Sequence, residues 1–319
     1  MQQFETDKKI VNVIKQLTLH HNKDNLSRTE AYFNYFKSYP EIKWSFLASM
    51  VSRNSGYNMC DLEGEYFSNL LDPSFRKLLY LTYERANWLI FQDIFPQLMI
   101  YKYSTKFKRP LFHLMEYFQV SDFIQNEWEH YWDKRDENRL LTALIINEQN
   151  VIHKPVIKHP IYKNSVFHSF IFQMEDWFHF SCVLFPTCEG KVYGASVNGF
   201  RKVDKRIDLG KRLANILFQP QLFPDFFVFA EKQTHTGSRY DYERYFSKKN
   251  YRKTPYLRTA FPIISHHLHN KVDWSLKKKV PHSWLFGDII HKHPIQLNDW
   301  YEKKQSQIQL LVALNQLIK

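Results

Sequence analysis

The stretch DPSFRKLLYLTYERANWLIFQDIFP, residues 72–96, contains the strongest helix signal in the chain and sets the expected fold. Asp72 followed by Pro73 marks a helix start, because a carboxylate caps free backbone N–H groups and proline suits the first helical position. The run over residues 75–95 is apolar over a wide arc, which predicts a helix buried at the centre of the protein. Pro96 is expected to kink or end that helix.

Helical periodicity extends on both sides of this stretch. A serine with a glutamate three residues later forms a capping box at Ser27 and Glu30, and again at Ser38 and Glu41. The second box predicts a helix that ends near Gly56, where a left-handed residue costs little. An extended piece is expected over residues 192–197, and further helices from Pro110 and over residues 10–17, 61–70, 122–150, 166–185, 207–218, 223–231 and 298–317.

These elements predict a mainly α fold, an irregular multi-helix bundle with a loop-rich, basic C-terminal third. A chain of 319 residues can bury a full core, and no internal repeat or low-complexity linker divides it. We therefore expect a single domain over residues 1–319. Its possible halves are a neutral helical part over residues 1–150 and a basic part over residues 151–319.

The composition indicates an ordered globular protein with excess positive charge. Aromatic residues make up 17% of the chain and only eight residues are glycine, which argues against disorder and against glycine-rich nucleotide folds. The net charge is +12, and residues 201–293 hold 19 basic and 8 acidic residues, whereas residues 1–200 are neutral. Such an excess favours an anionic partner, either nucleic acid or a phosphorylated ligand. The alternative is a basic solvated surface without a specific ligand.

Cysteine usage and hydropathy predict a cytoplasmic protein. Three cysteines cannot all pair with one another, and so few fit a reducing compartment. The first residues include an early acidic side chain and no apolar core of a signal peptide. No stretch is long and apolar enough to predict a transmembrane helix. Peripheral contact with a membrane stays open.

The segment RNSGYN, residues 53–58, followed by Asp61, is the first candidate for chemistry. It resembles the catalytic stretch of lytic transglycosylases and goose-type lysozymes, in which a glutamate at a helix end protonates the glycosidic oxygen. Asn54 occupies the glutamate position here, and an amide has no titratable proton to donate. We therefore expect a helix cap at this point, with Arg53 paired to an acid such as Asp61 or Glu63.

The segment THTGSRYDYE, residues 234–243, is the second candidate. Its Thr-Gly-Ser turn exposes backbone N–H groups, and an arginine fork suits a phosphate or carboxylate. The expected anion-binding residues of this segment are Ser238, Arg239 and Arg244. The expected catalytic residues are His235 for proton transfer, with Asp241 and Arg53 as orienting groups. The alternative is a plain helix start capped by Ser238 or Asp241.

Lysines and histidines later in the chain supply the remaining candidates. Three consecutive residues, Lys277, Lys278 and Lys279, lie between Trp274 and Trp284, a pattern that suits phosphate contacts together with stacking. Histidines gather at residues 266, 267 and 269, yet no HExxH or paired CxxC motif accompanies them, so no metal site is predicted. No glycine-rich phosphate loop is present either, and any cofactor remains unknown.

Five segments together resemble one family. They are RTEAY at 28–32, PEIKWSFLA at 40–48, MVSRNSGYNM at 50–59, YERANWLIF at 83–91 and HTGSR at 235–239. In these segments the chain resembles the YppC-like family of uncharacterised bacterial proteins, a domain of unknown function. The resemblance implies a cytoplasmic bacterial protein and supplies no catalytic residue.

Three functions are compatible with these patterns. The preferred hypothesis is a binding protein whose basic C-terminal third holds an anionic partner, nucleic acid or a phosphorylated ligand. The first alternative is a hydrolase or transferase acting on a phosphorylated substrate, which requires the candidate residues to converge in one pocket. The second is a scaffold protein that uses exposed aromatic residues. The oligomeric state is unknown.

Overall fold

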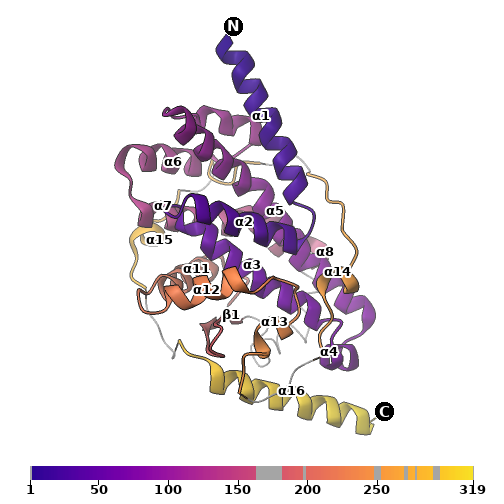
Figure 1. The fold of residues 1–319 in the computed structure, drawn as a ribbon. Coiled ribbons are helices and arrows are strands. Elements are labelled where there is room, and N and C mark those ends of the chain that lie inside the picture. The colour runs from indigo at the N-terminus through magenta and orange to yellow at the C-terminus, as the bar shows by residue number, and fades with distance from the viewer. Residues whose placement is uncertain are drawn as a thin grey trace.

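The computed structural model describes residues 2–162, 182–196, 199–247, 253–268, 272–276, 279–289 and 295–318. The fold is mainly α, as expected, with one two-stranded antiparallel sheet in the described part of the chain. The helices of the first half pack side by side around the long helix α5, and α16 crosses the end of the molecule opposite the N-terminus of α1 (Figure 1). None of the described helices is long and apolar enough to span a membrane.

The central helix is α5 (Pro73–Phe107), and Asp72 caps it by accepting a hydrogen bond from the Ser74 backbone N–H at 2.8 Å. The prediction that Pro96 ends the helix is wrong, because α5 runs on to a left-handed residue, Lys108. Every residue over 94–101 is buried. Proline removes one helical hydrogen bond at a cost of about 3 kcal/mol, and the burial of this whole segment offsets that cost.

Helices α2 (Asn25–Ser38) and α3 (Lys43–Asp61) form the closest pair of elements. Both capping boxes expected here are wrong. Asp24 caps α2 by accepting from the Ser27 N–H at 2.8 Å, and Ser38 is the last residue of α2 rather than the start of α3. The first cap was expected three residues late, because Asp24 precedes Ser27, and the second was expected four residues before the observed N-cap of α3, Ile42.

Gly56 does not end α3, which continues to Asp61. Its glycine serves close packing instead. A Cβ atom at this position would lie 2.5 Å from Asn25 Oδ1 and 2.6 Å from His235 Nε2. The missing side chain therefore lets α2 and the segment around His235 approach the middle of α3.

The remaining helices of the first half complete the layer around α5. The helix expected over 122–150 is two helices, because Arg135 adopts a left-handed conformation (φ 57°) and Asp136 caps a new start. These elements are α1 (Gln2–His21), α4 (Glu65–Leu70), the 3-10 helix η1 (Phe112–Phe118), α6 (Asp122–Lys134), α7 (Glu137–Val151), the π-helical turn η2 (His153–Ile157) and α8 (Pro160–Tyr162).

The sheet pairs β1 (Cys182–Pro186) with β2 (Val192–Ser196), which confirms the extended piece over 192–196. A helix was expected over residues 166–185. Its end is wrong, because residues 182–185 belong to the strand β1. The rest of that expected helix lies outside the described residues. The backbone of residues 295–297 hydrogen-bonds β2 on its other side and leads into α16.

The C-terminal half adds two long helices and several short ones. The helices expected over 207–218, 223–231 and 298–317 are confirmed. These elements are α11 (Val203–Leu217), α12 (Phe223–Lys232), α13 (Tyr240–Glu243), α14 (Leu257–Ala260), α15 (His282–Phe286) and α16 (Asn298–Ile318). Helix α3 contacts α2, α5, α7, α11 and β1, so it joins the two halves of the chain.

A buried ion pair ties α2 to α5. Arg28 Nη2 lies 2.5 Å from Glu84 Oε2, and the two side chains are 1% and 2% exposed. Removing one partner of such a pair leaves an uncompensated buried charge. We therefore expect Arg28→Ala to lower the free energy of unfolding by about 3–5 kcal/mol in urea denaturation.

Arg258→Ala is the matched control for this prediction. Arg258 also pairs with an aspartate, Asp24, but its side chain is 62% exposed. Its loss is expected to cost less than about 1 kcal/mol. Equal losses from the two substitutions would contradict the central role of the α2–α5 pair.

Candidate functional site

The predicted catalytic residues His235 and Asp241 meet inside the protein. His235 Nε2 lies 2.9 Å from Asn25 Oδ1, and its Nδ1 lies 3.4 Å from Asp241 Oδ2. The Asp241 carboxylate also accepts hydrogen bonds from the backbone N–H and the hydroxyl of Thr236. The pKa of His235 is lowered to about 4, chiefly by burial and also by the charge of Arg53, although the hydrogen bond to Asp241 acts in the opposite direction. The ring is therefore neutral at physiological pH.

The Arg239 guanidinium donates hydrogen bonds to three residues of its own chain. Nε donates to Asp61 Oδ2 at 2.6 Å, Nη2 to Asn58 Oδ1 at 2.9 Å and Nη1 to the Tyr242 hydroxyl at 2.6 Å. The residue is 7% exposed. Ser238 is also buried, and its hydroxyl donates to the Thr254 carbonyl at 2.9 Å.

Arg53 lies beside this cluster and connects α3 to the end of α12. Its Nη1 donates to the Gln233 carbonyl at 2.8 Å and its Nη2 to the Ala230 carbonyl at 2.9 Å, so it holds the end of α12 against α3. The expected ion pair of Arg53 with Asp61 or Glu63 is wrong, because Asp61 pairs with Arg239 and Glu63 with Arg76. Asn54 accepts from the Leu184 N–H at 3.0 Å and thereby fixes β1.

The structure thus gathers five of the nine predicted site residues into one buried network, which we name the α3 lock. It consists of Arg53, Ser238, Arg239, His235 and Asp241 with their partners Asn25, Asn58, Asp61, Thr236 and Tyr242. The catalytic and anion-binding roles stay predictions, and these contacts favour a structural role.

The other predicted residues lie apart from the α3 lock. Arg244 is exposed and donates to Gln233 Oε1 and the Tyr245 hydroxyl. Lys279 is exposed, and the remaining two, Lys277 and Lys278, lie outside the described residues. The seven predicted site residues that the structure describes line neither of the two pockets described next.

The larger pocket has a volume of about 840 Å³ and lies between α1, α5, η1, the end of α7, η2 and the residues 265–268, 272 and 274. We name it the cationic pocket. Its basic lining residues are Lys15, Arg85, Lys154, His159, His266 and His267. Among the described lining residues there is one carboxylate, Asp93, which accepts from Gln97 Nε2 at 2.8 Å and from Asn147 Nδ2 at 2.6 Å.

Side-chain packing holds two of these basic groups in place. Arg85 lies over the Trp88 ring, 4.9 Å from its centroid, and donates to the His267 carbonyl at 3.1 Å. His266 also packs against Trp88, and its Nε2 lies 3.6 Å from Glu84 Oε1. The loop over 265–268 is therefore fixed to α5 at the edge of the pocket.

Sequence reasoning found only part of the cationic pocket. The histidines at 266 and 267 and the nearby Trp274 stood out, and all three line it. Lys15, Arg85 and Lys154 are single basic residues far apart in the chain. No local motif marks them, and only the tertiary fold brings them together.

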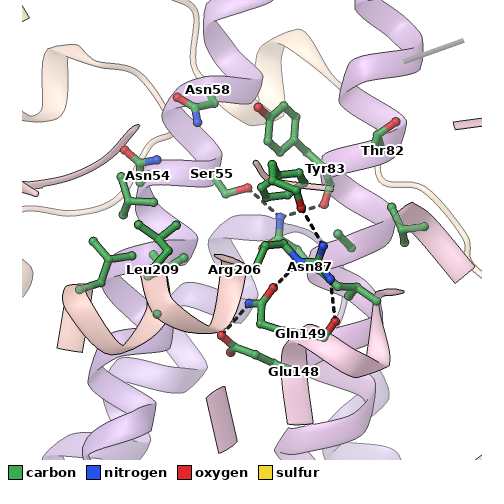
Figure 2. Close-up of a pocket in the computed structure, with 18 of the residues that line it drawn as sticks. Asn54, Ser55, Asn58, Thr82, Tyr83, Asn87, Glu148, Gln149, Arg206 and Leu209 are labelled. Carbon is green, nitrogen blue, oxygen red and sulfur yellow. Dashed lines mark hydrogen bonds between the residues drawn. The ribbon is translucent and has the colours of Figure 1, made fainter. Parts of the chain in front are cut away.

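The smaller pocket, of about 200 Å³, lies between α3, α5, α7 and α11 (Figure 2). We name it the apolar pocket, since leucine, isoleucine and valine dominate its walls. Three polar residues meet at one end: Gln149 donates to Glu148 Oε1 at 3.0 Å and accepts from Arg206 Nε at 2.8 Å. Burial raises the pKa of Glu148 to about 7 and lowers that of Arg206 to about 10.

Metal-binding groups do not gather in the described ranges. No three histidine, cysteine, aspartate or glutamate side chains come close enough there to hold a metal ion. Of the histidines that gather at 266, 267 and 269 in the sequence, His269 lies outside the described residues.

Comparison with known proteins places nearly the whole chain in one group of sequences. A family model described as a protein of unknown function, DUF2515, matches residues 20–302. The uncharacterized protein YppC of Bacillus subtilis (strain 168) is 43% identical over 320 residues, which covers 100% of this chain and 99% of that protein. No solved structure matches the chain.

The α3 lock predicts a large stability loss on removing Arg239. We expect Arg239→Ala to lower the free energy of unfolding by about 3–5 kcal/mol, because Asp61 stays buried without its partner. Arg244→Ala, five residues along and exposed, is expected to change it by no more than about 0.5 kcal/mol. Urea denaturation measures both. A loss for Arg239→Ala as small as that of the control would contradict the structural role.

The lowered pKa of the buried His235 ring predicts that the free energy of unfolding falls in acid. Its pKa is about 4 in the folded protein and 6.5 in the unfolded chain, so its contribution is intact above about pH 6.5 and is lost as the pH falls toward about 4. One proton taken up by the unfolded chain costs about 1.4 kcal/mol per pH unit in this window. Between about pH 7 and about pH 5, the free energy of unfolding of the His235→Gln variant is expected to fall by about 2 kcal/mol less than that of the wild type.

The control for this measurement is His113→Gln, since the His113 side chain is 53% exposed. It is expected to keep the wild-type acid dependence. If His235→Gln also keeps that dependence, the buried neutral ring is not the cause.

Proposed function

Since the chain belongs to the DUF2515 family of proteins of unknown function, as its sequence motifs predicted, we propose its function from its geometry: it binds a small phosphorylated ligand in the cationic pocket. The observation that carries this proposal is the convergence of Lys15, Arg85 and Lys154 on one pocket. They come from α1, α5 and η2, so no single helix accounts for their proximity.

The chemistry of the pocket supports an anion as its ligand. Arginine offers a planar fork that matches a phosphate, and lysine adds a mobile positive charge. The imidazoles of three histidines supply further hydrogen-bonding groups. Asp93, the carboxylate in the lining, already accepts from two amides and is 2% exposed. Its charge therefore opposes an anion less than an open carboxylate does.

The size of the pocket supports a small molecule rather than nucleic acid. Its volume of about 840 Å³ lies within the range of about 300–1,000 Å³ typical of ligand pockets. Nucleic-acid surfaces instead arrange basic residues along an open stripe or groove. Tyr117, Phe118 and Trp274 also line the pocket and offer flat faces to an organic part of the ligand.

This proposal moves the anion site that the sequence predicted. The C-terminal third contributes His266, His267 and Trp274 to the pocket. The three lysine and arginine side chains among the described lining residues come instead from the first 154 residues. Arg239 and Ser238 support the protein elsewhere, in the α3 lock.

Isothermal titration with inorganic pyrophosphate tests the proposal. The double variant Lys15→Ala, Lys154→Ala removes two exposed charges from the pocket. We expect it to weaken binding at least about tenfold, since a hydrogen bond to a charged group contributes about 1.5–3 kcal/mol. Added salt is expected to weaken wild-type binding as well.

Lys158→Ala is the matched control, because Lys158 is exposed four residues beyond Lys154 and does not line the pocket. It is expected to bind pyrophosphate as wild type does. The proposal fails if pyrophosphate does not bind or if the double variant binds it unchanged. It also fails if a single-stranded oligonucleotide binds more tightly than pyrophosphate and binds the double variant as tightly as the wild type.

A further inference from the structure

We infer that the apolar pocket is a second ligand site, which takes a small organic ammonium ion with the Glu148 carboxylate as its counter-ion. This inference does not rest on the proposed function, because the two pockets are separate. They lie on opposite sides of a common wall. Residues 149, 152, 156 and 157 line the apolar pocket, whereas residues 150, 151, 154 and 155 line the cationic pocket.

The pocket has the size and the walls for a small organic molecule. Its volume of about 200 Å³ exceeds the ~150 Å³ of a cavity that accommodates benzene. The walls consist largely of side chains such as Leu79, Ile152, Val156 and Leu213. An apolar group of a ligand would therefore leave water on binding, which favours binding by about 25 cal/mol per Å².

Among the described lining residues of this pocket, Glu148 is the one carboxylate, and neutral groups provide its hydrogen bonds. Trp44 Nε1 donates to Oε2 at 3.0 Å, and Gln149 Nε2 donates to Oε1 at 3.0 Å. Within the described ranges, no lysine or arginine side chain forms an ion pair with Glu148. A partly buried carboxylate is stabilised most by a cation, and no described lysine or arginine pairs with this one.

Arg206 is the other charged residue among the described lining residues, and it forms no ion pair with Glu148. Its guanidinium donates to Gln149 Oε1, to the Gln149 carbonyl and to the Phe200 carbonyl, all neutral acceptors. The Gln149 side chain lies between the two charged groups (Figure 2). Burial raises the pKa of Glu148, and the hydrogen bonds from Gln149 and Trp44 act in the opposite direction.

A second acceptor in the lining suits the hydrogen atoms of an ammonium group. Asn87 Nδ2 donates to Ser55 Oγ and to the Tyr83 carbonyl, each at 2.8 Å (Figure 2). These bonds fix the amide, and its carbonyl oxygen has no donor among the described residues. An ammonium ion carries three donors and no acceptor. A ligand anion, in contrast, would meet the like charge of Glu148.

Benzylammonium and benzyl alcohol are a matched pair of probes, since they share size and ring and differ in charge. At about pH 8 the Glu148 carboxylate is ionised. Titration of wild-type protein is expected to show at least tenfold tighter binding of benzylammonium. Glu148→Gln keeps the shape and removes the charge, so it is expected to abolish that preference. Glu189→Gln, at an exposed carboxylate of the β1–β2 turn, is expected to keep it.

The outcomes separate clearly. Equal affinities of the two probes for wild-type protein would overturn the inference, as would no binding of either. A preference for benzylammonium that survives in a cooperatively folded Glu148→Gln variant would overturn it too. If that variant does not fold, the comparison of the two probes on wild-type protein decides. Failure here leaves pyrophosphate binding untouched, because that test uses another pocket and another probe.

Discussion

The buried contact between Arg239 and Asp61 is the constraint on which the arrangement of the chain depends. It joins residues 178 positions apart at 2.6 Å, and both side chains are almost fully buried. Asn58 and Tyr242 bind the other two nitrogens of the guanidinium, so the charge is compensated and its hydrogen bonds are satisfied. A buried pair of this kind stabilises little on its own but costs much to break, so it specifies one arrangement.

The same logic extends along α3. Of its 19 residues 16 are buried, including polar ones that are rarely found inside unless they are hydrogen-bonded. Arg53 holds the end of α12, Asn54 holds β1, and Asn58 with Asp61 holds Arg239. Gly56 leaves room between them for His235 and Asn25. The polar positions Arg53, Asn54, Asn58 and Asp61 of this half of α3 thus bind three distant segments: the end of α12, β1 and Arg239.

The fixed position of α3 against α5 and α7 also shapes the pockets. The apolar pocket lies between these helices and α11, and its polar end is set by Glu148 and Gln149 near the end of α7. The cationic pocket uses the opposite side of α5 and of the segment over 150–155. The π-helical turn η2 lies in this shared wall, and such turns are frequent at functional sites. Two ligands of opposite charge would therefore bind on either side of one segment.

Sequence patterns predicted the helices better than the sites. The Asp72–Pro73 start and the wide apolar arc identified α5, because local capping and periodicity determine where such a helix begins and faces. Its passage through Pro96 could not be predicted, since burial against distant residues outweighs the local cost. The HTGSR segment was predicted to be an anion site because Ser238 and Arg239 would bind phosphate well if they were exposed. Their burial depends on Asp61 and Thr254, which local sequence does not place beside them.

The central claim is that the 235–241 turn holds the fold while the cationic pocket holds the ligand. Backbone amide hydrogen exchange, measured with and without saturating inorganic pyrophosphate, tests it most directly. We predict slower exchange with pyrophosphate in peptides covering residues 150–159 and 265–268, and unchanged exchange over residues 235–244. Slower exchange confined to residues 235–244 would contradict the account and return the anion site to the turn.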